Sequence, residues 1–323
     1  MQHSYNPFLF LKNGHINTVF PTLFRIQAEL PYERVELDTP DGDFLHVDCL
    51  FGGHKRLVIL CHGLEGSSRS KYIVGSAKIL KNNGWDVVSV NYRSCSGVMN
   101  RNLQMYHSGA THDLEVVVNH FIDRYEELIF VGFSLGGNLS LKYAGERGNA
   151  LDERIKAIIG VSVPTDLGAG SLNIGQPSNF IYNKKFMVTL KEKMRQKAVD
   201  FPEDIDLELL EKIGKLYEFD DHFTGPINGF RDAEDYYTQC SSKKFIPHIE
   251  RHAYIVNALD DPFLPEACYP YAEVASNRYA KLWTPKHGGH VGFVQLFRKH
   301  YWIEELILAI AKKHSKFNEP SFI

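Results

Sequence analysis

The sequence LIFVGFSLGG occupies residues 128–137 and joins two kinds of pattern. Residues 128–133 form a short apolar run typical of a buried strand, and a helical pattern follows over residues 137–146, with Ser134 between them. A tight strand-to-helix turn brings backbone close to backbone, so the positions that flank the serine must lack bulk. Gly132 and Gly136 meet that demand. The motif predicts a serine that projects from a strained turn, beside a helix N-terminus that favours developing negative charge.

Other glycine-rich turns fit this stretch less well. A plain turn with a solvated serine is the main alternative, although the flanking strand and helix patterns disfavour it. A dinucleotide-binding loop would have glycine in place of Ser134. A phosphate-binding loop would have Lys followed by Ser or Thr at the positions of Asn138 and Leu139.

Strand and helix patterns alternate on both sides of this turn. The expected strands include continuous apolar runs, as in strands that are buried on both faces. These strands cover residues 56–61, 85–92 and 155–163. Helices are expected over residues 71–83 and 111–125. A hairpin is expected over residues 32–51, around the turn TPDG. This order predicts an α/β fold with a mostly parallel sheet flanked by helices, in which ligands bind at the carboxyl ends of the strands.

The alternation stops between residues 165 and 245. Helical patterns at 186–199 and 207–217 occupy this stretch without a clear strand, and the insertion is too long for a plain loop. We therefore predict a helical cap over the sheet, within a single domain that spans residues 1–323. After the cap the alternation returns, with strands expected at 253–259 and 279–283 and helices at 266–276 and 297–313.

A serine hydroxyl becomes a good nucleophile only when a base removes its proton. In this architecture the chain order is serine, acid, histidine. Asp260 and Asp261 follow one late strand, and the run HGGH at residues 287–290 follows the next. By resemblance to α/β-hydrolases, which commonly have proline four residues after the acid, Asp261 is favoured over Asp260.

The remaining aspartate and histidine have other expected roles. His290 is favoured over His287 because it follows glycine, as the histidine of α/β-hydrolases usually does. Asp260 and His287 are then expected to contact the triad residues rather than the substrate. A metal centre at the two histidines is the alternative, but no cluster supplies a third and fourth ligand. No metal and no cofactor are expected.

The run HGLEG at residues 62–66 follows the strand at 56–61. Because a glycine precedes Leu64, its backbone N–H can point into the site, and the N–H of Leu135 would be the second donor of an oxyanion hole. A glycine turn without a role is the alternative. Arg93 is expected near the rim, where a structural ion pair is favoured over contact with a substrate anion.

Composition excludes several classes of function. The chain has 36 Lys and Arg against 39 Asp and Glu, a formal charge of −3, which argues against a general nucleic-acid binder. No run approaches the roughly 18 apolar residues that a membrane helix requires. The five cysteines are scattered and include no Cys-x-x-Cys pair, which favours a reduced, cytoplasmic location.

The chain resembles the YheT-like family of α/β-hydrolases over nearly its whole length. The shared runs are Asn13-Gly14-His15 with Thr18, then residues 62–67, 92–97, 106–109, 132–138, 219–221, 235–237 with Cys240 and Ser241, 260–263 and 287–293. The resemblance implies a hydrolase with Ser134, Asp261 and His290 as its triad. Family members are described as carboxylesterases, and eukaryotic relatives act on phospholipids and carry a membrane anchor, which we do not expect in this chain. Ser94 stands where bacterial members have glycine.

The sequence therefore predicts a serine hydrolase that cleaves small-molecule carboxylic esters. Aromatic residues of the cap suggest an apolar acyl pocket, although aromatics at helical spacing are more often core; they are Phe180, Tyr182, Phe186, Tyr217 and Phe219. A thioesterase or acyltransferase would use the same triad. A binding protein on the same fold, without catalysis, is the rival from another class.

Overall fold

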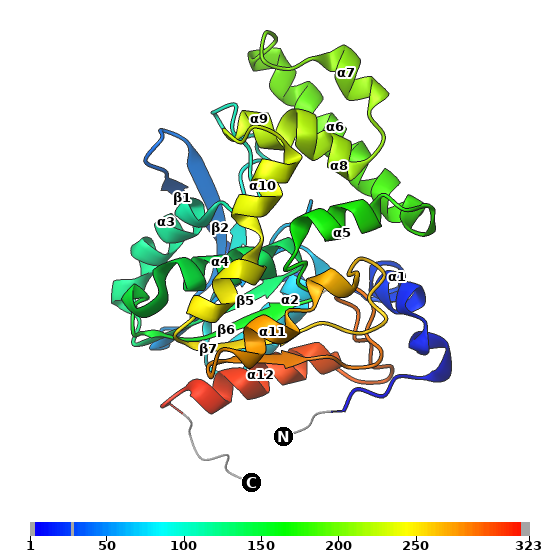
Figure 1. Ribbon diagram of the computed structural model, residues 1–323. Helices are drawn as coiled ribbons and strands as arrows, with labels where there is room; N and C mark the ends of the chain where they lie inside the picture. Colours follow the sequence, from blue (N-terminus) through cyan, green and yellow to red (C-terminus); the bar gives the residue numbers. More distant parts are fainter. Residues whose placement is uncertain (1–3, 27–28, 318–323) are drawn as a thin grey trace.

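The computed structural model describes residues 4–26 and 29–317. Within them, eight strands form one sheet in the order β1-β2-β4-β3-β5-β6-β7-β8 (Figure 1). The strands are β1 (Glu33–Asp38), β2 (Phe44–Leu50), β3 (Arg56–Cys61), β4 (Asp86–Asn91), β5 (Glu127–Phe133), β6 (Ile155–Val161), β7 (His252–Val256) and β8 (Ala280–Trp283). β2 pairs antiparallel with β1 and β4, and every pair from β4 to β8 is parallel. The predicted mostly parallel α/β sheet is confirmed.

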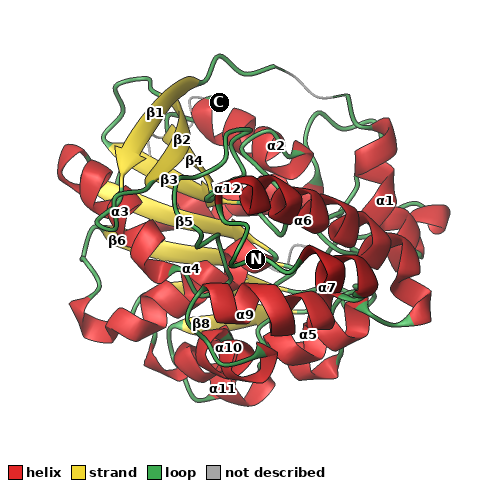
Figure 2. Cartoon of the chain, turned by 90° about the horizontal axis from the view of Figure 1, so that it is seen from above, coloured by secondary structure: helices red, strands yellow, loops and turns green. Residues whose placement is uncertain are grey.

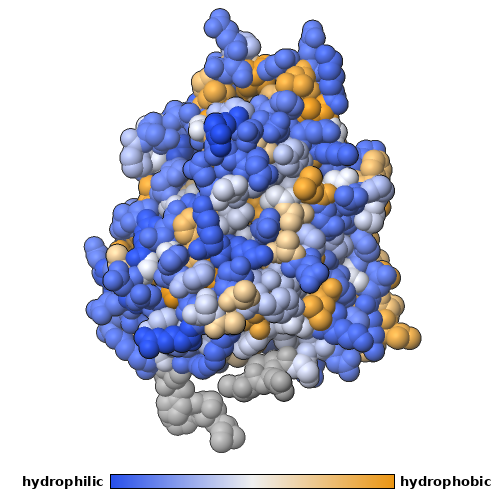
Figure 3. Space-filling model, viewed as in Figure 1, coloured by the Kyte–Doolittle hydropathy of each residue, from blue (hydrophilic) through white to orange (hydrophobic). Residues whose placement is uncertain are grey.

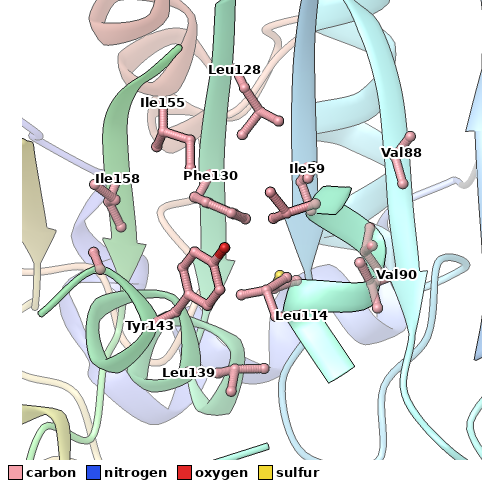
Figure 4. Close-up of a cluster of buried hydrophobic side chains, with 14 of the residues drawn as sticks. Ile59, Val88, Val90, Leu114, Leu128, Phe130, Leu139, Tyr143, Ile155 and Ile158 are labelled. Atoms are coloured by element: carbon pink, nitrogen blue, oxygen red, sulfur yellow. The ribbon is translucent and has the colours of Figure 1, made fainter. Parts of the chain in front are cut away.

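Helices cover both faces of the sheet, as Figure 2 shows. On one face, α3 (Thr111–Phe121) and α4 (Leu135–Arg147) pack on side chains such as Ile59 and Phe130 (Figure 4). On the other face, α2 (Lys71–Lys81) and α12 (Trp302–His314) pack on a second apolar cluster. The central strands are apolar throughout because both of their faces are buried.

Helices without an intervening strand fill the described stretch between β6 and β7. We call them the cap helices; they are α5 (Leu167–Ile174), α6 (Phe180–Asp200), α7 (Leu207–Lys212), α8 (Leu216–Phe219), a π-helix (Asp220–Thr224), α9 (Gly225–Ile227) and α10 (Ala233–Cys240). In Figure 1 the helices from α6 to α9 stand above the sheet. Buried side chains that include Met194, Leu210 and Phe219 give them an apolar core of their own.

Several predicted helices differ from the structure in their extent. The helix predicted over 186–199 begins six residues earlier, as α6, and the one predicted over 111–125 ends as α3 at Phe121. The helix predicted over 207–217 is two, α7 and α8, because Gly214 lies between them. The helix predicted over 266–276 is a 3₁₀ turn (Glu266–Cys268) and α11 (Tyr271–Ala275), separated at Pro270. The last helix begins at Trp302 rather than near residue 297.

The N-terminal segment holds a 3₁₀ turn (Leu9–Lys12) and the helix α1 (Gly14–Phe24), which the sequence analysis did not predict. Asn13 caps α1 by accepting a hydrogen bond from the Ile16 N–H at 3.1 Å. Among the described residues, no helix has both the length and the apolar character that crossing a bilayer requires.

Candidate active site

Ser134 lies at the turn between β5 and α4, at the carboxyl edge of the sheet. Its backbone has φ 53° and ψ −118°, a conformation that is strained for any residue with a side chain. A Cβ added at Gly132 would lie 2.2 Å from the Gly136 oxygen, and one added at Gly136 would lie 2.4 Å from the Cys61 oxygen. Both positions therefore require glycine, and the close approach forces the serine outward.

His290 and Asp261 meet beyond the ends of β7 and β8. The Nδ1 atom of His290 lies 2.9 Å from Asp261 Oδ2 and 3.1 Å from Oδ1. The Asp261 side chain is fully buried, and its Oδ1 also accepts the Phe263 N–H at 2.9 Å. The Phe263 ring stacks on the imidazole with 4.1 Å between ring centroids. Together these contacts fix the ring with Nδ1 toward the carboxylate and leave Nε2 for the cavity.

Asp260 and His287 form a separate pair behind this one. Asp260 Oδ2 lies 3.3 Å from His287 Nδ1, and its Oδ1 accepts the Gly289 N–H at 2.9 Å. Burial raises the pKa of the Asp260 carboxyl above its ordinary value. Asp260 thus holds the backbone one residue before His290, whereas Asp261 holds its ring. Among the described residues, no group of three or more His, Cys, Asp or Glu side chains could hold a metal ion.

The backbone N–H groups of Leu64 and Leu135, which lie near Ser134, have no acceptor in the described part of the chain. The N–H groups on either side of Leu64 are both occupied. Gly63 donates to the Tyr72 hydroxyl at 3.0 Å, and Glu65 donates to the Tyr106 hydroxyl at 3.0 Å. Glu65 has a φ of 55°, which turns the chain sharply after Leu64. This is the pattern that an oxyanion hole needs, since its donors must be oriented yet unpaired before substrate arrives.

Arg93 lies in a separate network of ion pairs. It is 4% exposed, and its guanidinium contacts Asp113 and Asp41 at 2.6 Å each and Asp43 at 3.4 Å. A side chain that already binds three carboxylates is not available for a substrate anion. The structure therefore does not bring Arg93 together with the other predicted site residues, and the structural ion pair is the reading that fits.

Thr18 and Ser162 hold the loop that carries His290, and the sequence analysis did not identify either of them as a site residue. The His290 N–H donates to Thr18 Oγ1 of α1 at 2.8 Å, and the Val291 N–H donates to Ser162 Oγ at 3.0 Å. A Cβ on Gly14 would lie 1.8 Å from the Asp260 oxygen, so α1 must begin with glycine there. Gly14 and Thr18 are among the residues that carry the family resemblance, and these contacts give both of them a structural role.

Two cavities meet at Ser134. The first, about 810 Å³ of empty space partly open to solvent, runs under the cap helices and is mainly apolar, with Met105, Leu190 and Phe219 in its wall. The second, about 1470 Å³ and also partly open, contains both Ser134 and His290 and extends to α1, Lys71 and Lys185. Leu64 lines both cavities. Of the cap aromatics, Phe219 lines the first cavity and Tyr182 and Phe186 the second, whereas Phe180 is exposed and Tyr217 packs beside Tyr237.

No hydrogen bond joins the Ser134 hydroxyl to His290 within the described residues, although both face the second cavity. Such bonds are often long in unliganded enzymes and tighten when substrate binds. The arrangement offers a serine hydroxyl at the wall of a cavity, an imidazole held by a buried carboxylate and two unpaired N–H donors. These are the components of nucleophilic acyl transfer.

Comparison with known proteins places this geometry in a family. Residues 56–295 match the family described as having the alpha/beta hydrolase fold. The chain belongs to the alpha/beta hydrolase fold family. Across 308 residues it is 34% identical to YheT of Escherichia coli, which is named as an esterase, covering 91% of this chain and 89% of that one. The resemblance to YheT-like α/β-hydrolases is confirmed.

More distant relatives share the fold. A mouse protein named Phospholipase ABHD3 is 26% identical over 304 residues, covering 90% of this chain and 74% of its own. The structure of the esterase Pf2001 from Pyrococcus furiosus superposes with a TM-score of 0.60 at 14% identity, over 97% of this chain and 98% of the other. This α/β-hydrolase therefore has esterase-type and lipase-type relatives.

Proposed function

We propose that this protein is a serine hydrolase that cleaves carboxylic esters through an acyl-enzyme on Ser134. The observation that carries the proposal is the His290 ring, which is bound to buried Asp261 at 2.9 Å and shares a cavity with the strained, half-buried Ser134. The cap helices, within a single catalytic domain, enclose the substrate. Five buried free cysteines support a reducing, cytoplasmic setting.

In the proposed mechanism each step has its own residue. The Ser134 oxygen attacks the ester carbonyl carbon while His290 Nε2 takes the hydroxyl proton, and Asp261 stabilises the resulting imidazolium. The N–H groups of Leu64 and Leu135 donate to the tetrahedral oxyanion. The imidazolium returns the proton to the leaving alcohol. Water then attacks the acyl-enzyme, with His290 as its base, and the carboxylic acid is released. No step needs a cofactor.

The two cavities suggest which part of the ester each of them binds. The apolar cavity under the cap helices suits the acyl group, since its wall offers Leu, Met and Phe side chains and burial of each methylene contributes about 0.8 kcal/mol. The second cavity has charged side chains, among them Lys185 and Glu65, and suits the alcohol side of the ester. The phospholipase name of the mouse relative agrees with an apolar acyl group beside a polar leaving group.

The test is covalent labelling together with turnover. Wild-type protein should react with a fluorophosphonate probe and hydrolyse short-chain nitrophenyl esters. Ser134→Ala should lose the label, and kcat should fall by roughly 10⁴–10⁶. Its fold should be preserved, because the substitution removes only a hydroxyl at the wall of a cavity and leaves the packing of the turn unchanged. Folded wild-type protein that takes no label would favour the binding-protein reading. A Ser134→Ala variant with full activity would reject the nucleophile.

A further inference from the structure

Exposed apolar side chains gather around α1 and the loop that precedes α12. We call them the α1 surface; they are Phe8, Leu9, Phe10, Leu23, Phe24, Ile26 and Phe297. Ile26 and Phe297 are each 95% exposed. Phe297 contacts Phe8 with 6.1 Å between ring centroids, so the N-terminal segment and the α12 loop form one surface. Figure 3 shows hydrophobic side chains at the edge of the molecule where Figure 1 draws α1.

The same surface carries positive charge. A groove lined by Phe24, Ile26 and Phe297 also contains five basic side chains and, among the described residues, no acidic one. The basic side chains are Arg25, Lys71, Lys78, Arg298 and Lys299. Arg25 is bound to the buried Glu304 at 2.5 Å, whereas Arg298 and Lys299 form no ion pair within the described part of the chain.

The excess of positive charge is local. The chain has 39 acidic residues and a net charge of −3, yet its first acidic residue is Glu29. On the α1 surface, exposed aromatic and aliphatic side chains therefore lie beside the cations Arg298 and Lys299, which have no acidic partner among the described residues. Single exposed apolar residues are ordinary, but a contiguous apolar region marks an interaction site.

We propose that the α1 surface docks on a lipid bilayer that contains anionic lipids. Apolar side chains at such a surface enter the boundary between headgroups and acyl chains, and each Lys or Arg near an anionic leaflet contributes about 1 kcal/mol. A protein partner is the weaker reading, because the cores of protein interfaces are depleted in lysine. Here the cations Lys78 and Lys299 lie in the same groove as the exposed rings.

The docking surface adjoins the candidate active site. Arg25, Lys71 and Tyr301 line both the basic groove and the second cavity, which reaches Ser134 and His290. On its buried side, α1 holds the His290 backbone through Thr18. Docking would therefore bring the mouth of that cavity against the bilayer. This consequence for turnover rests on the proposed function, whereas the docking does not.

The experiment is co-sedimentation of the full chain with vesicles. Phosphatidylcholine vesicles are compared with vesicles that also contain about 30 mol % phosphatidylglycerol. We expect at least roughly tenfold tighter binding to the anionic vesicles, and weakening in about 0.5 M salt. Phe297→Ser and the pair Arg298→Glu with Lys299→Glu should each weaken binding about tenfold or more. Val199→Ser, at an exposed apolar position of α6 in the cap, should not.

Two further measurements separate the outcomes. Ser134→Ala should bind vesicles as the wild type does, so loss of catalysis would leave this proposal standing. Phe297→Ser should hydrolyse a soluble short-chain ester at the wild-type rate, which shows that the fold is intact. Equal binding to both kinds of vesicle, or binding that the three substitutions leave unchanged, would overturn the proposal. So would a dimer that dissociates on Phe297→Ser when no vesicle binds.

Discussion

Asp260 and Asp261 are neighbours in the chain but bind different histidines. Asp260 lies in a turn after β7, which the Asp261 N–H closes by donating to the Ala258 oxygen at 3.2 Å, and this turn directs Asp260 to His287 and Asp261 to His290. Asp261→Asn keeps the size of the side chain but removes the charge that holds His290 in its productive tautomer. We expect kcat to fall by about 10⁴. Asp260→Asn should reduce kcat far less, since its carboxylate binds His287 and the Gly289 N–H rather than the His290 ring. Steady-state kinetics of the two variants provide the comparison.

Thermal unfolding of the same variants is the control. Asp261→Asn should unfold within a few degrees of the wild type, so that its loss of activity is chemical. If instead Asp260→Asn is the variant with the larger loss in kcat, the two aspartates have been assigned to the wrong roles.

The residues that sequence reasoning identified lie in local motifs. Ser134 and the Leu64 loop each follow a strand and have glycine beside them, so their chemistry could be read from a few neighbouring positions. Thr18 and Ser162 support the same site from 272 and 129 residues away from the residues they bind. Nothing near them in the chain indicates that contact, because it exists only once the sheet has formed.

Among the elements, the strands were predicted closely because doubly buried strands are continuous apolar runs. The helix α1 was not predicted, since its interior contains Pro21 and its exposed face is apolar rather than polar.

The backbone conformation of Ser94 could not be predicted from the sequence either. Ser94 adopts a φ of 61° at a position where bacterial relatives were expected to have glycine, and its hydroxyl lies 2.5 Å from Asn100 Oδ1. A side-chain contact of this kind offsets local strain without a sequence signal.

The cap helix α6 is tied to the Leu64 loop by Lys193. Its Nζ lies 2.7 Å from Glu65 Oε1, which also accepts the Tyr106 hydroxyl at 2.7 Å. The Glu65 side chain is 6% exposed. Lys193→Met leaves that carboxylate buried without its cation, and we expect the free energy of unfolding to fall by about 3–5 kcal/mol. We also expect a lower kcat, since Glu65 orients the Leu64 N–H.

Urea unfolding and kinetics test this link between cap and loop. Lys191→Met is the matched control, because Lys191 lies on the same helix and, within the described residues, its ammonium donates only to the Glu211 carbonyl oxygen, at 3.1 Å. It should change the free energy of unfolding by no more than about 0.5 kcal/mol. If Lys193→Met behaves like this control, the buried pair does not connect the cap helices to the loop.

For the molecule as a whole, two buried histidines should make stability depend on pH. Burial lowers the pKa of both His62 and His107 to about 3. His62 Nδ1 lies 2.7 Å from the Gly63 oxygen, and the Tyr92 N–H donates to its Nε2 at 3.3 Å. Only the neutral ring with its proton on Nδ1 satisfies both contacts. A second proton would face the Tyr92 N–H, so the folded protein excludes it.

The sign of the effect follows from which state binds protons. The unfolded histidines titrate near 6.5, so below that pH the unfolded chain takes up protons that the folded chain does not. Each histidine then lowers the free energy of unfolding by about 1.4 kcal/mol per pH unit, or about 4 kcal/mol for both at pH 5. Asp220 acts in the opposite direction, because burial raises its pKa from 3.8 to about 6. It offsets part of this loss, on the order of 1 kcal/mol at pH 5.

Urea unfolding at about pH 7.5, 6 and 5 measures the combined slope. We expect stability to be level above about pH 6.5 and to fall by a few kcal/mol at pH 5. His107→Gln should reduce the slope of unfolding free energy against pH by the contribution of one proton, since glutamine does not titrate. His54 is exposed, and His54→Asn should leave the slope unchanged. Stability that stays constant down to pH 5 in the wild type would show that both imidazoles can be protonated in the folded state, and would contradict their burial as neutral rings.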